Sequence, residues 1–278
     1  MSLAASAPPA PVRVMGVLNM TPDSFSDGGS LGSVEAGLAR ALALVRAGAD
    51  ILDVGGESTR PGATPVPADE EIVRVVPLIR AIRAESGAPI SVDTMKPEVA
   101  RAAVAAGATI WNDVAALRWP GALEAAAELG CDVVLMHMQG EPGTMQREPR
   151  YDDVVADVAD FLAARAEAAM AAGVARERIW LDPGVGFGKH MIRHNLPLLA
   201  GLPRIVGLGF PVLLGVSRKS FIGALDEQAP PDARLGGSIA AALAGAAAGV
   251  AAVRVHDVRE TVQALRVWQA IVQAGYQV

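Results

Sequence analysis

The chain has 278 residues, of which 51% are hydrophobic and 19% are charged, and its formal net charge is −6 at neutral pH. That length is typical of one (β/α)8 barrel, which usually needs about 250 residues. The acidic balance argues against a nucleic-acid partner, because nucleic-acid binding favours a basic surface. The single cysteine, Cys131, excludes an internal disulfide and fits a reducing cytoplasm.

Residues 1–11 are rich in Ala, Pro and Ser and are expected to form a flexible tail ahead of one domain at residues 12–278. They lack the basic and then apolar succession of a signal peptide. The apolar run at residues 239–253 is interrupted by two glycines and is shorter than the roughly 20 residues that span a bilayer. We therefore expect no contact with a membrane.

Short apolar segments that predict strands alternate along the chain with longer segments of helical periodicity. The first strand is expected at residues 12–18, and the first helix runs from Ser33, as its N-cap, to about Arg46. Six further strands are expected at 50–54, 89–92, 109–111, 132–136, 211–216 and 251–255, and one more ends in Asp182; the main later helices are expected at 67–86, 152–172 and 258–273.

Eight strand–helix units without hairpin signals predict a parallel sheet that closes into a (β/α)8 barrel. The alternative is an open doubly wound sheet. It is disfavoured because the chain has no G-x-G-x-x-G turn after its first strand.

Polar side chains stand at or just after the ends of the expected strands. In a parallel barrel these ends share one mouth, where active sites are built. The sixth strand ends in Asp182, and a glycine-rich loop then leads to Lys189, so that backbone can approach a flat or phosphorylated ligand. The other polar strand ends are Asn19, Thr59, Asp93, Asn112, Lys219, Arg254 and His256. Any one of them alone is compatible with a helix cap or a solvated residue, whereas their convergence favours a binding site. His137 is interpreted as structural.

The residue types suggest a planar heterocycle. The side chains of Asp93, Asn112 and Asp182 can accept hydrogen bonds from an amidine-like edge, as carboxylates do from cytosine amino groups. Lys219 can donate to a ring carbonyl and ring nitrogen, and Arg254 can lie over the ring face as a planar cation.

A second set of side chains suits an anion, close to the N-terminus of the last helix. This set is Asn19, Thr59, Arg60, Arg254 and His256. His and Cys do not cluster at zinc spacing, and one Asn suits a Mg²⁺ ion that arrives with a diphosphate and keeps its waters. The sequence offers no convincing Ser-His-Asp or Cys-His set.

Several motifs resemble those of the dihydropteroate synthase family of pterin-binding enzymes. They are MGVLNMTPDSFSDGG at 15–29, GESTRPG at 56–62, DPGVGFGK at 182–189, SRKS at 217–220 and RVHD at 254–257, together with Asp93 and Asn112-Asp113. The resemblance covers about residues 15–258. Four residues separate Lys189 from His194, where it leads us to expect three.

The resemblance implies a transferase of folate biosynthesis that joins a dihydropterin diphosphate to p-aminobenzoate, with Mg²⁺ as cofactor. It assigns catalysis to Asp93, Asp182, Lys219 and Arg254, pterin binding to these four with Thr59 and Asn112, diphosphate binding to Asn19, Arg60, Arg254 and His256, and the metal to Asn19. The aminobenzoate pocket, where sulfonamides also bind, would comprise Phe25, Pro61, Phe187, Lys219 and Ser220.

The resemblance further implies an SN1-like displacement and a homodimer formed through the alanine-rich helices at 234–249 and 258–273. Those helix faces are also compatible with packing on the barrel. Two other functions remain open at this stage. One is a related barrel that holds a methylated folate for transfer to cobalamin, and the other is an inactive paralogue with a regulatory role.

Overall fold

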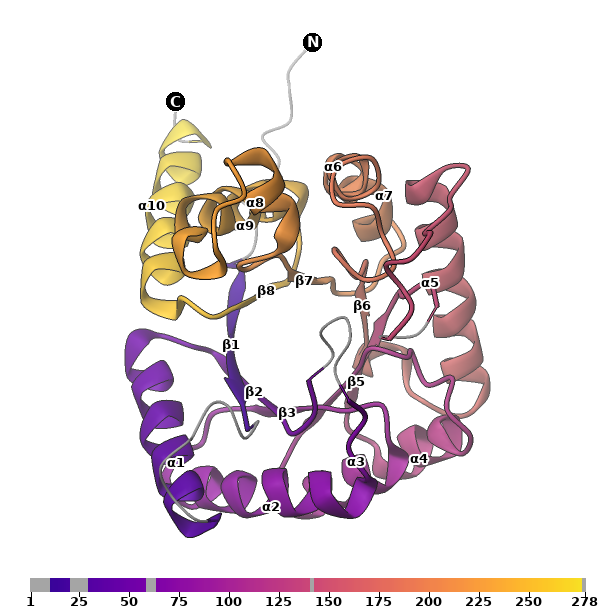
Figure 1. The fold of residues 1–278 in the computed structure, drawn as a ribbon, viewed down its shortest axis with the longest axis vertical. Helices are drawn as coiled ribbons and strands as arrows, with labels where there is room; N and C mark the ends of the chain where they lie inside the picture. The colour runs from indigo at the N-terminus through magenta and orange to yellow at the C-terminus, as the bar shows by residue number, and fades with distance from the viewer. Residues whose placement is uncertain (1–10, 21–29, 59–63, 141–142, 277–278) are drawn as a thin grey trace.

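The computed structural model describes residues 11–20, 30–58, 64–140 and 143–276. Within them, eight parallel strands form one sheet that curves into a barrel, with the helices around its outside (Figure 1). The strands are β1 Arg13–Asn19, β2 Ile51–Gly55, β3 Ile90–Asp93, β4 Ile110–Asp113, β5 Asp132–Met136, β6 Ile179–Asp182, β7 Leu213–Gly215 and β8 Ala252–Val255. Residues 1–10 of the expected tail lie outside the described residues.

Two strand contacts close the sheet into a barrel. β1 pairs in parallel with both β2 and β8, so the first and last strands are neighbours. β6 and β7 meet through an isolated bridge between Leu181 and Val212, and the Leu181 N–H donates to the Pro211 carbonyl at 2.9 Å. The predicted (β/α)8 barrel is therefore confirmed. β7 is shorter than the strand expected at 211–216.

The helices follow the strands in the expected alternation. They are α1 Ser30–Ala47, α2 Ala68–Glu85, α3 Pro97–Ala105, α4 Ala122–Leu129, α5 Val154–Ala171, α6 Asn195–Ala200, α7 Leu202–Val206, α8 Ser220–Leu225, α9 Leu235–Ala248 and α10 Val258–Tyr276. α1 begins at Ser30, so the prediction that Ser33 is its N-cap is wrong. The backbone N–H groups in the first turn of a helix have no acceptor inside the helix, so several neighbouring residues can serve as its start and residue type alone locates it poorly. Among the described residues, no helix is both long and apolar enough to cross a bilayer.

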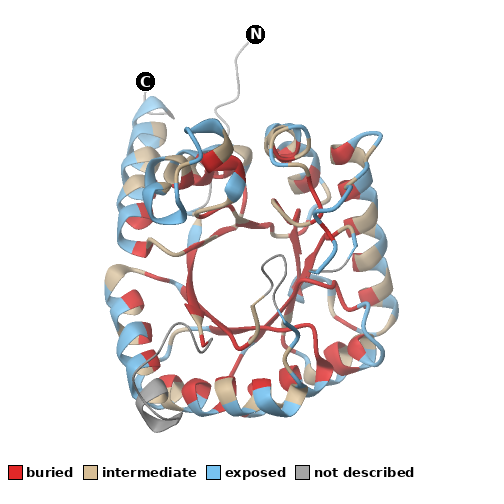
Figure 2. Cartoon of the chain, in the orientation of Figure 1, coloured by how far each residue is buried: buried red, intermediate tan, exposed pale blue. Residues whose placement is uncertain are grey.

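The core has two parts. One layer fills the barrel interior with side chains from seven of the strands or their first residues: Met15, Ile51, Ile110, Val134, Trp180, Leu213 and Ala252. A larger cluster packs between the strands and the surrounding helices, and Figure 2 shows the buried ring of strands inside helices whose outer faces are exposed. The interior layer makes the barrel a packed core, so a ligand site is expected at the mouth.

Candidate active site

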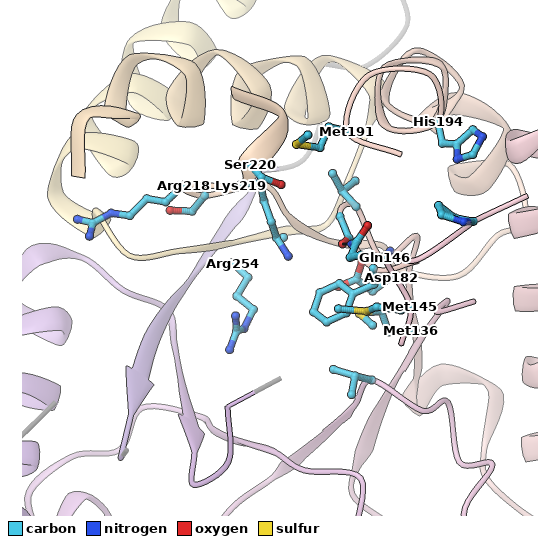
Figure 3. Close-up of a pocket in the computed structure, with 18 of the residues that line it drawn as sticks. Met136, Met145, Gln146, Asp182, Met191, His194, Arg218, Lys219, Ser220 and Arg254 are labelled. Carbon is cyan, nitrogen blue, oxygen red and sulfur yellow. Dashed lines mark hydrogen bonds between the residues drawn. The ribbon is translucent and has the colours of Figure 1, made fainter. Parts of the chain in front are cut away.

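A cavity of about 1430 Å³ opens at the carboxyl ends of the strands. Nine of the residues expected at the site line it: Asn19, Asp93, Asn112, Asp182, Phe187, Lys219, Ser220, Arg254 and His256. Phe25, Thr59, Arg60 and Pro61 lie outside the described residues. Figure 3 shows Lys219 and Arg254 pointing into the cavity from one side, with Asp182 opposite. The structure thus brings together the expected residues that it describes.

A buried ion network forms the floor of the cavity. Arg254 on β8 reaches across the barrel and donates from Nη2 to Asp93 Oδ2 at 2.9 Å and from Nε to Asp53 Oδ2 at 2.6 Å. Burial raises the pKa of Asp93 to about 7, although the charge of Arg254 opposes this shift. The other Asp93 oxygen, Oδ1, is buried and has no hydrogen-bond partner among the described residues. An unpaired buried oxygen is a costly group that a ligand donor would satisfy.

Asp53 is a site residue that the sequence reasoning missed. It lies in the middle of β2 and is fully buried. Besides accepting from Arg254, it accepts from Asn112 Nδ2 at 3.5 Å, so one carboxylate orients two groups of the cavity floor. The available signal was a charged residue inside the otherwise apolar strand Ile-Leu-Asp-Val-Gly, since a carboxylate is almost never fully buried unless it is paired.

Asp182 and Lys219 are oppositely charged residues of the cavity wall, and the charge of each affects the pKa of the other. Asp182 Oδ1 accepts the Gly184 N–H at 2.7 Å, and burial raises the pKa of Asp182 to about 6. Burial lowers the pKa of Lys219 to about 8, against the pull of the Asp182 charge. Lys219 Nζ lies 4.2 Å from the centroid of the Phe187 ring. The lysine therefore lies over an aromatic face and within the electrostatic influence of an acid.

An apolar surface accompanies these charges. Met136 and Met145 are buried and line the cavity, and with Val114 they belong to a cluster against which Phe187 packs. Figure 3 shows both methionines beside Asp182. The site thus combines a charged floor with a flat, partly aromatic wall, which suits a ring that is polar at one edge.

The opposite rim carries groups suited to an anion. The His256 N–H donates to Ser217 Oγ at 3.2 Å, and His256 Nδ1 lies 3.1 Å from the same oxygen. Arg218 is turned away in Figure 3, and its Nε donates to Asp257 at 3.0 Å. Arg218 thus ties the segment after β7 to Asp257, which follows β8.

Asn19 ends β1 and lines the cavity on this side. No group of three or more His, Cys, Asp or Glu side chains able to hold a metal is found among the described residues. An all-protein metal cage is therefore missing from that part of the chain. One amide oxygen does fit a Mg²⁺ ion that takes its remaining ligands from water and phosphate.

A third buried network holds the start of the loop after β2, also unforeseen from the sequence. Lys96 Nζ donates to Glu57 and, at 2.6 Å, to Glu71 Oε2, and Arg74 Nη1 donates to the Gly56 carbonyl at 2.8 Å. Glu57 lines the cavity. This network fixes the end of β2 before residues 59–63, which lie outside the described residues.

These features define the class: a (β/α)8 barrel with a cavity at the carboxyl ends of its strands that suits a polar ring and an anion. The model of one family, described as pterin binding enzyme, matches residues 15–256. The dihydropteroate synthase of Escherichia coli strain K12 is 51% identical over 262 residues, which cover 94% of this chain and 92% of that protein.

Two solved structures are similar throughout. Dihydropteroate synthase of Xanthomonas albilineans with 4-aminobenzoic acid has a TM-score of 0.88 and 56% identity, covering 94% of this chain and 93% of that one. The Yersinia pestis enzyme with a sulfonamide drug has a TM-score of 0.89 and 46% identity, covering 95% of each chain. The chain belongs to the pterin-binding enzymes and, within them, to the dihydropteroate synthases.

Proposed function

We propose that this transferase condenses 6-hydroxymethyl-7,8-dihydropterin diphosphate with p-aminobenzoate to give 7,8-dihydropteroate and diphosphate, in folate biosynthesis. Identity of 51% with a dihydropteroate synthase across nearly the whole chain supports this activity. The observation that carries the proposal is the floor in which Arg254 joins Asp93 to Asp53, with one Asp93 oxygen left unpaired. A flat ring with donors along one edge is the ligand that such a floor fits.

The pterin would bind with its amidine-like edge toward Asp93, Asn112 and Asp182. The free Asp93 oxygen and the Asp182 carboxylate are acceptors at 7% and 6% residue exposure, where a hydrogen bond to a charged group contributes about 1.5–3 kcal/mol. Lys219 would donate to the ring, and Arg254 would lie over its face. These roles, with Thr59 at the rim, complete the pterin site of the proposal.

The diphosphate would lie between Asn19, Arg254 and His256, with Arg60 as a further contact. Mg²⁺ would be held by the Asn19 side-chain oxygen, and when bound it supplies charge that offsets the leaving diphosphate. The protein's own cations act in the same direction, because positive groups at the rim stabilise the negative charge that grows as the C–O bond breaks.

The displacement would be SN1-like. The C–O bond to diphosphate breaks and its electron pair leaves with the diphosphate, so the dihydropterin methylene carries positive charge. Buried carboxylates at Asp93 and Asp182 stabilise that cation, because charges interact strongly in a poorly hydrated site. The amine lone pair then forms the C–N bond, and one amine proton passes to solvent or diphosphate. No covalent enzyme intermediate is needed.

The arylamine would lie against Phe187, Lys219 and Ser220, with Phe25 and Pro61 completing the pocket. The aromatic face of Phe187 and the Lys219 ammonium suit a benzoate ring and its carboxylate. Sulfonamides would compete for this pocket, in keeping with the similar Yersinia pestis structure that holds a sulfonamide drug.

We further propose that the protein works in the cytoplasm as a homodimer formed through α9 and α10. These helices contact each other and expose Leu235, Val267 and Ile271, with 36%, 56% and 67% of each residue accessible. Sedimentation analysis tests this. The wild type should sediment as a dimer and Val267→Glu should sediment as a monomer; a monomeric wild type would contradict the dimer.

The activity is tested by incubating the purified protein with the dihydropterin diphosphate and Mg²⁺, with and without p-aminobenzoate. Dihydropteroate and diphosphate should appear in equal amounts, and dihydropteroate only with the arylamine. Tight binding of the dihydropterin without product would contradict the synthase and favour a pterin-binding barrel for methyl transfer or an inactive paralogue.

A further inference from the structure

Two residues that the proposed mechanism does not use, His137 and Lys189, form a buried pair beside the cavity. Lys189 is fully buried, which is rare for lysine unless its charge is paired. Its Nζ lies 2.8 Å from His137 Nδ1, 2.9 Å from the Gly184 carbonyl oxygen and 3.0 Å from the Phe187 carbonyl oxygen. The two carbonyl oxygens can only accept, so Lys189 donates to both, and burial lowers the pKa of Lys189 well below its usual range.

His137 is the other member of the pair, and whether its Nδ1 accepts from or donates to Lys189 Nζ depends on the histidine tautomer. Burial and then the Lys189 charge lower the pKa of His137 to about 3, in agreement with a neutral ring. The rings of Tyr151 and Phe161 enclose the pair: Lys189 Nζ lies 6.0 Å from the Tyr151 centroid, and Phe161 meets His137 edge-on at 4.9 Å.

The pair lies where the end of β5 meets the loop after β6. The His137 N–H donates to the Asp182 carbonyl at 2.9 Å. Gly184 has a φ of +65°, and a Cβ there would lie 1.9 Å from the His137 carbonyl oxygen, so the loop backbone presses directly on the end of β5. Lys189 donates to the carbonyls of Gly184 and Phe187 and so binds both ends of the turn between them.

We propose that Lys189 and His137 are positioning residues that hold residues 184–188 against the end of β5 and thereby place the Phe187 ring over Lys219. The cation at Lys219 and the aromatic wall at Phe187 face the cavity together only while this turn is held. The pair acts through the turn and touches neither substrate. For its kinetic readout alone, the inference rests on the proposed function.

The first test is hydrogen–deuterium exchange of the loop, which does not depend on any activity. The amides of Gly184, Gly186 and Phe187 are bonded to Asp182 Oδ1, Asn195 Oδ1 and the Gly184 carbonyl at 2.7, 2.8 and 3.0 Å. In Lys189→Met their exchange should accelerate by about tenfold or more, because local opening controls exchange. Unchanged exchange would overturn the inference.

A matched control is Arg83→Met. Arg83 likewise holds a loop through carbonyls, donating to Gly107 at 3.0 Å and to Ser86 at 3.3 Å, but it lies at the end of α2 and bonds the segment that leads into β4. That segment is at the amino ends of the strands, away from the cavity. Arg83→Met should lower the melting temperature without changing exchange in residues 184–188.

Kinetics separate positioning from general destabilisation. Lys189→Met should raise the KM for p-aminobenzoate by about tenfold or more, since small misplacements of binding groups are costly. Arg83→Met should leave this KM within about twofold at equal fractions folded, by the same reasoning. An equal KM effect in both variants would overturn the positioning role.

His137 provides a second pair of variants in case Lys189→Met does not fold. Asn places a side-chain oxygen near the position of Nδ1, whereas Leu offers no acceptor. His137→Asn should keep the exchange of residues 184–188 and the KM for p-aminobenzoate near their wild-type values. His137→Leu should show faster exchange and a higher KM. Equal behaviour of these two variants would overturn the inference. If the wild type makes no dihydropteroate while the variants show the predicted changes in exchange, the proposed function is refuted and the role of the pair stands.

Discussion

Asp53→Asn isolates the contribution of the carboxylate that the sequence did not reveal. The substitution keeps the size of the side chain and removes a charge that accepts from Arg254 Nε at 2.6 Å and from Asn112 Nδ2 at 3.5 Å. Arg254 would then be held as an ion pair by Asp93 alone, at 2.9 Å. A hydrogen bond to a charged group contributes about 1.5–3 kcal/mol.

Since about 1.4 kcal/mol corresponds to a tenfold change in rate, kcat/KM for the dihydropterin diphosphate should fall by roughly 10- to 150-fold. The pH profile should shift as well. The charge of Asp53 helps to raise the pKa of Asp93, so its removal should move the acidic limb to lower pH. Steady-state kinetics with quantified dihydropteroate measure both effects.

Asp50→Asn is the control. Asp50 is exposed and precedes β2, and its carboxylate accepts the Val14 N–H at 2.8 Å near the amino ends of the strands. Its kcat/KM should stay within about twofold of wild type, as expected for a surface change away from the site. A kcat/KM for Asp53→Asn within about threefold of wild type, with an unmoved acidic limb, would refute the role given to Asp53.

Three further outcomes are expected. Asp93→Asn should lower kcat by roughly 100- to 1000-fold, the usual cost of losing one preorganised electrostatic group, with unchanged turnover as the contrary result. The pH profile of kcat/KM should rise as Asp182 and Asp93 ionise, at about 6 and about 7, and fall above about 8 as Lys219 loses its proton. A profile without the rise below about 7 and without the fall above about 8 would contradict the pKa shifts. Gly184→Ala should destabilise by roughly 3 kcal/mol in urea unfolding, because its Cβ would lie 1.9 Å from a carbonyl oxygen at a positive φ, whereas Gly87→Ala, with open space around it, should be near neutral.

The fold was predictable because its signals are local and repeated. Each strand is a short apolar run, each helix has its own periodicity, and the alternation itself implies parallel strands. The site was predictable to the extent that functional groups stand at strand ends. Asp93, Asn112 and Asp182 each end a strand or lie one residue from its end, and the barrel geometry brings them together.

What the sequence did not reveal are the long-range partners. Asp53 is separated from Arg254 by 201 positions, and the sequence around each residue does not indicate that the two form an ion pair. Likewise, Lys189 ends the glycine-rich loop after β6, yet its side chain is buried against His137, 52 positions away in the sequence. Pairing between buried charges depends on which strands become neighbours, and that follows only from the closed barrel.

The most direct test of the proposed chemistry is a kinetic isotope effect at the methylene that bears the diphosphate. Single-turnover reactions with enzyme in excess would compare undeuterated dihydropterin diphosphate with the form dideuterated at this methylene, at saturating p-aminobenzoate. If Asp93 and Asp182 stabilise a cation as the C–O bond breaks, the methylene carbon becomes trigonal in the transition state. The undeuterated substrate should then react measurably faster than the dideuterated one. Equal rates for the two substrates in the chemical step would contradict an SN1-like displacement and the role assigned to the buried carboxylates.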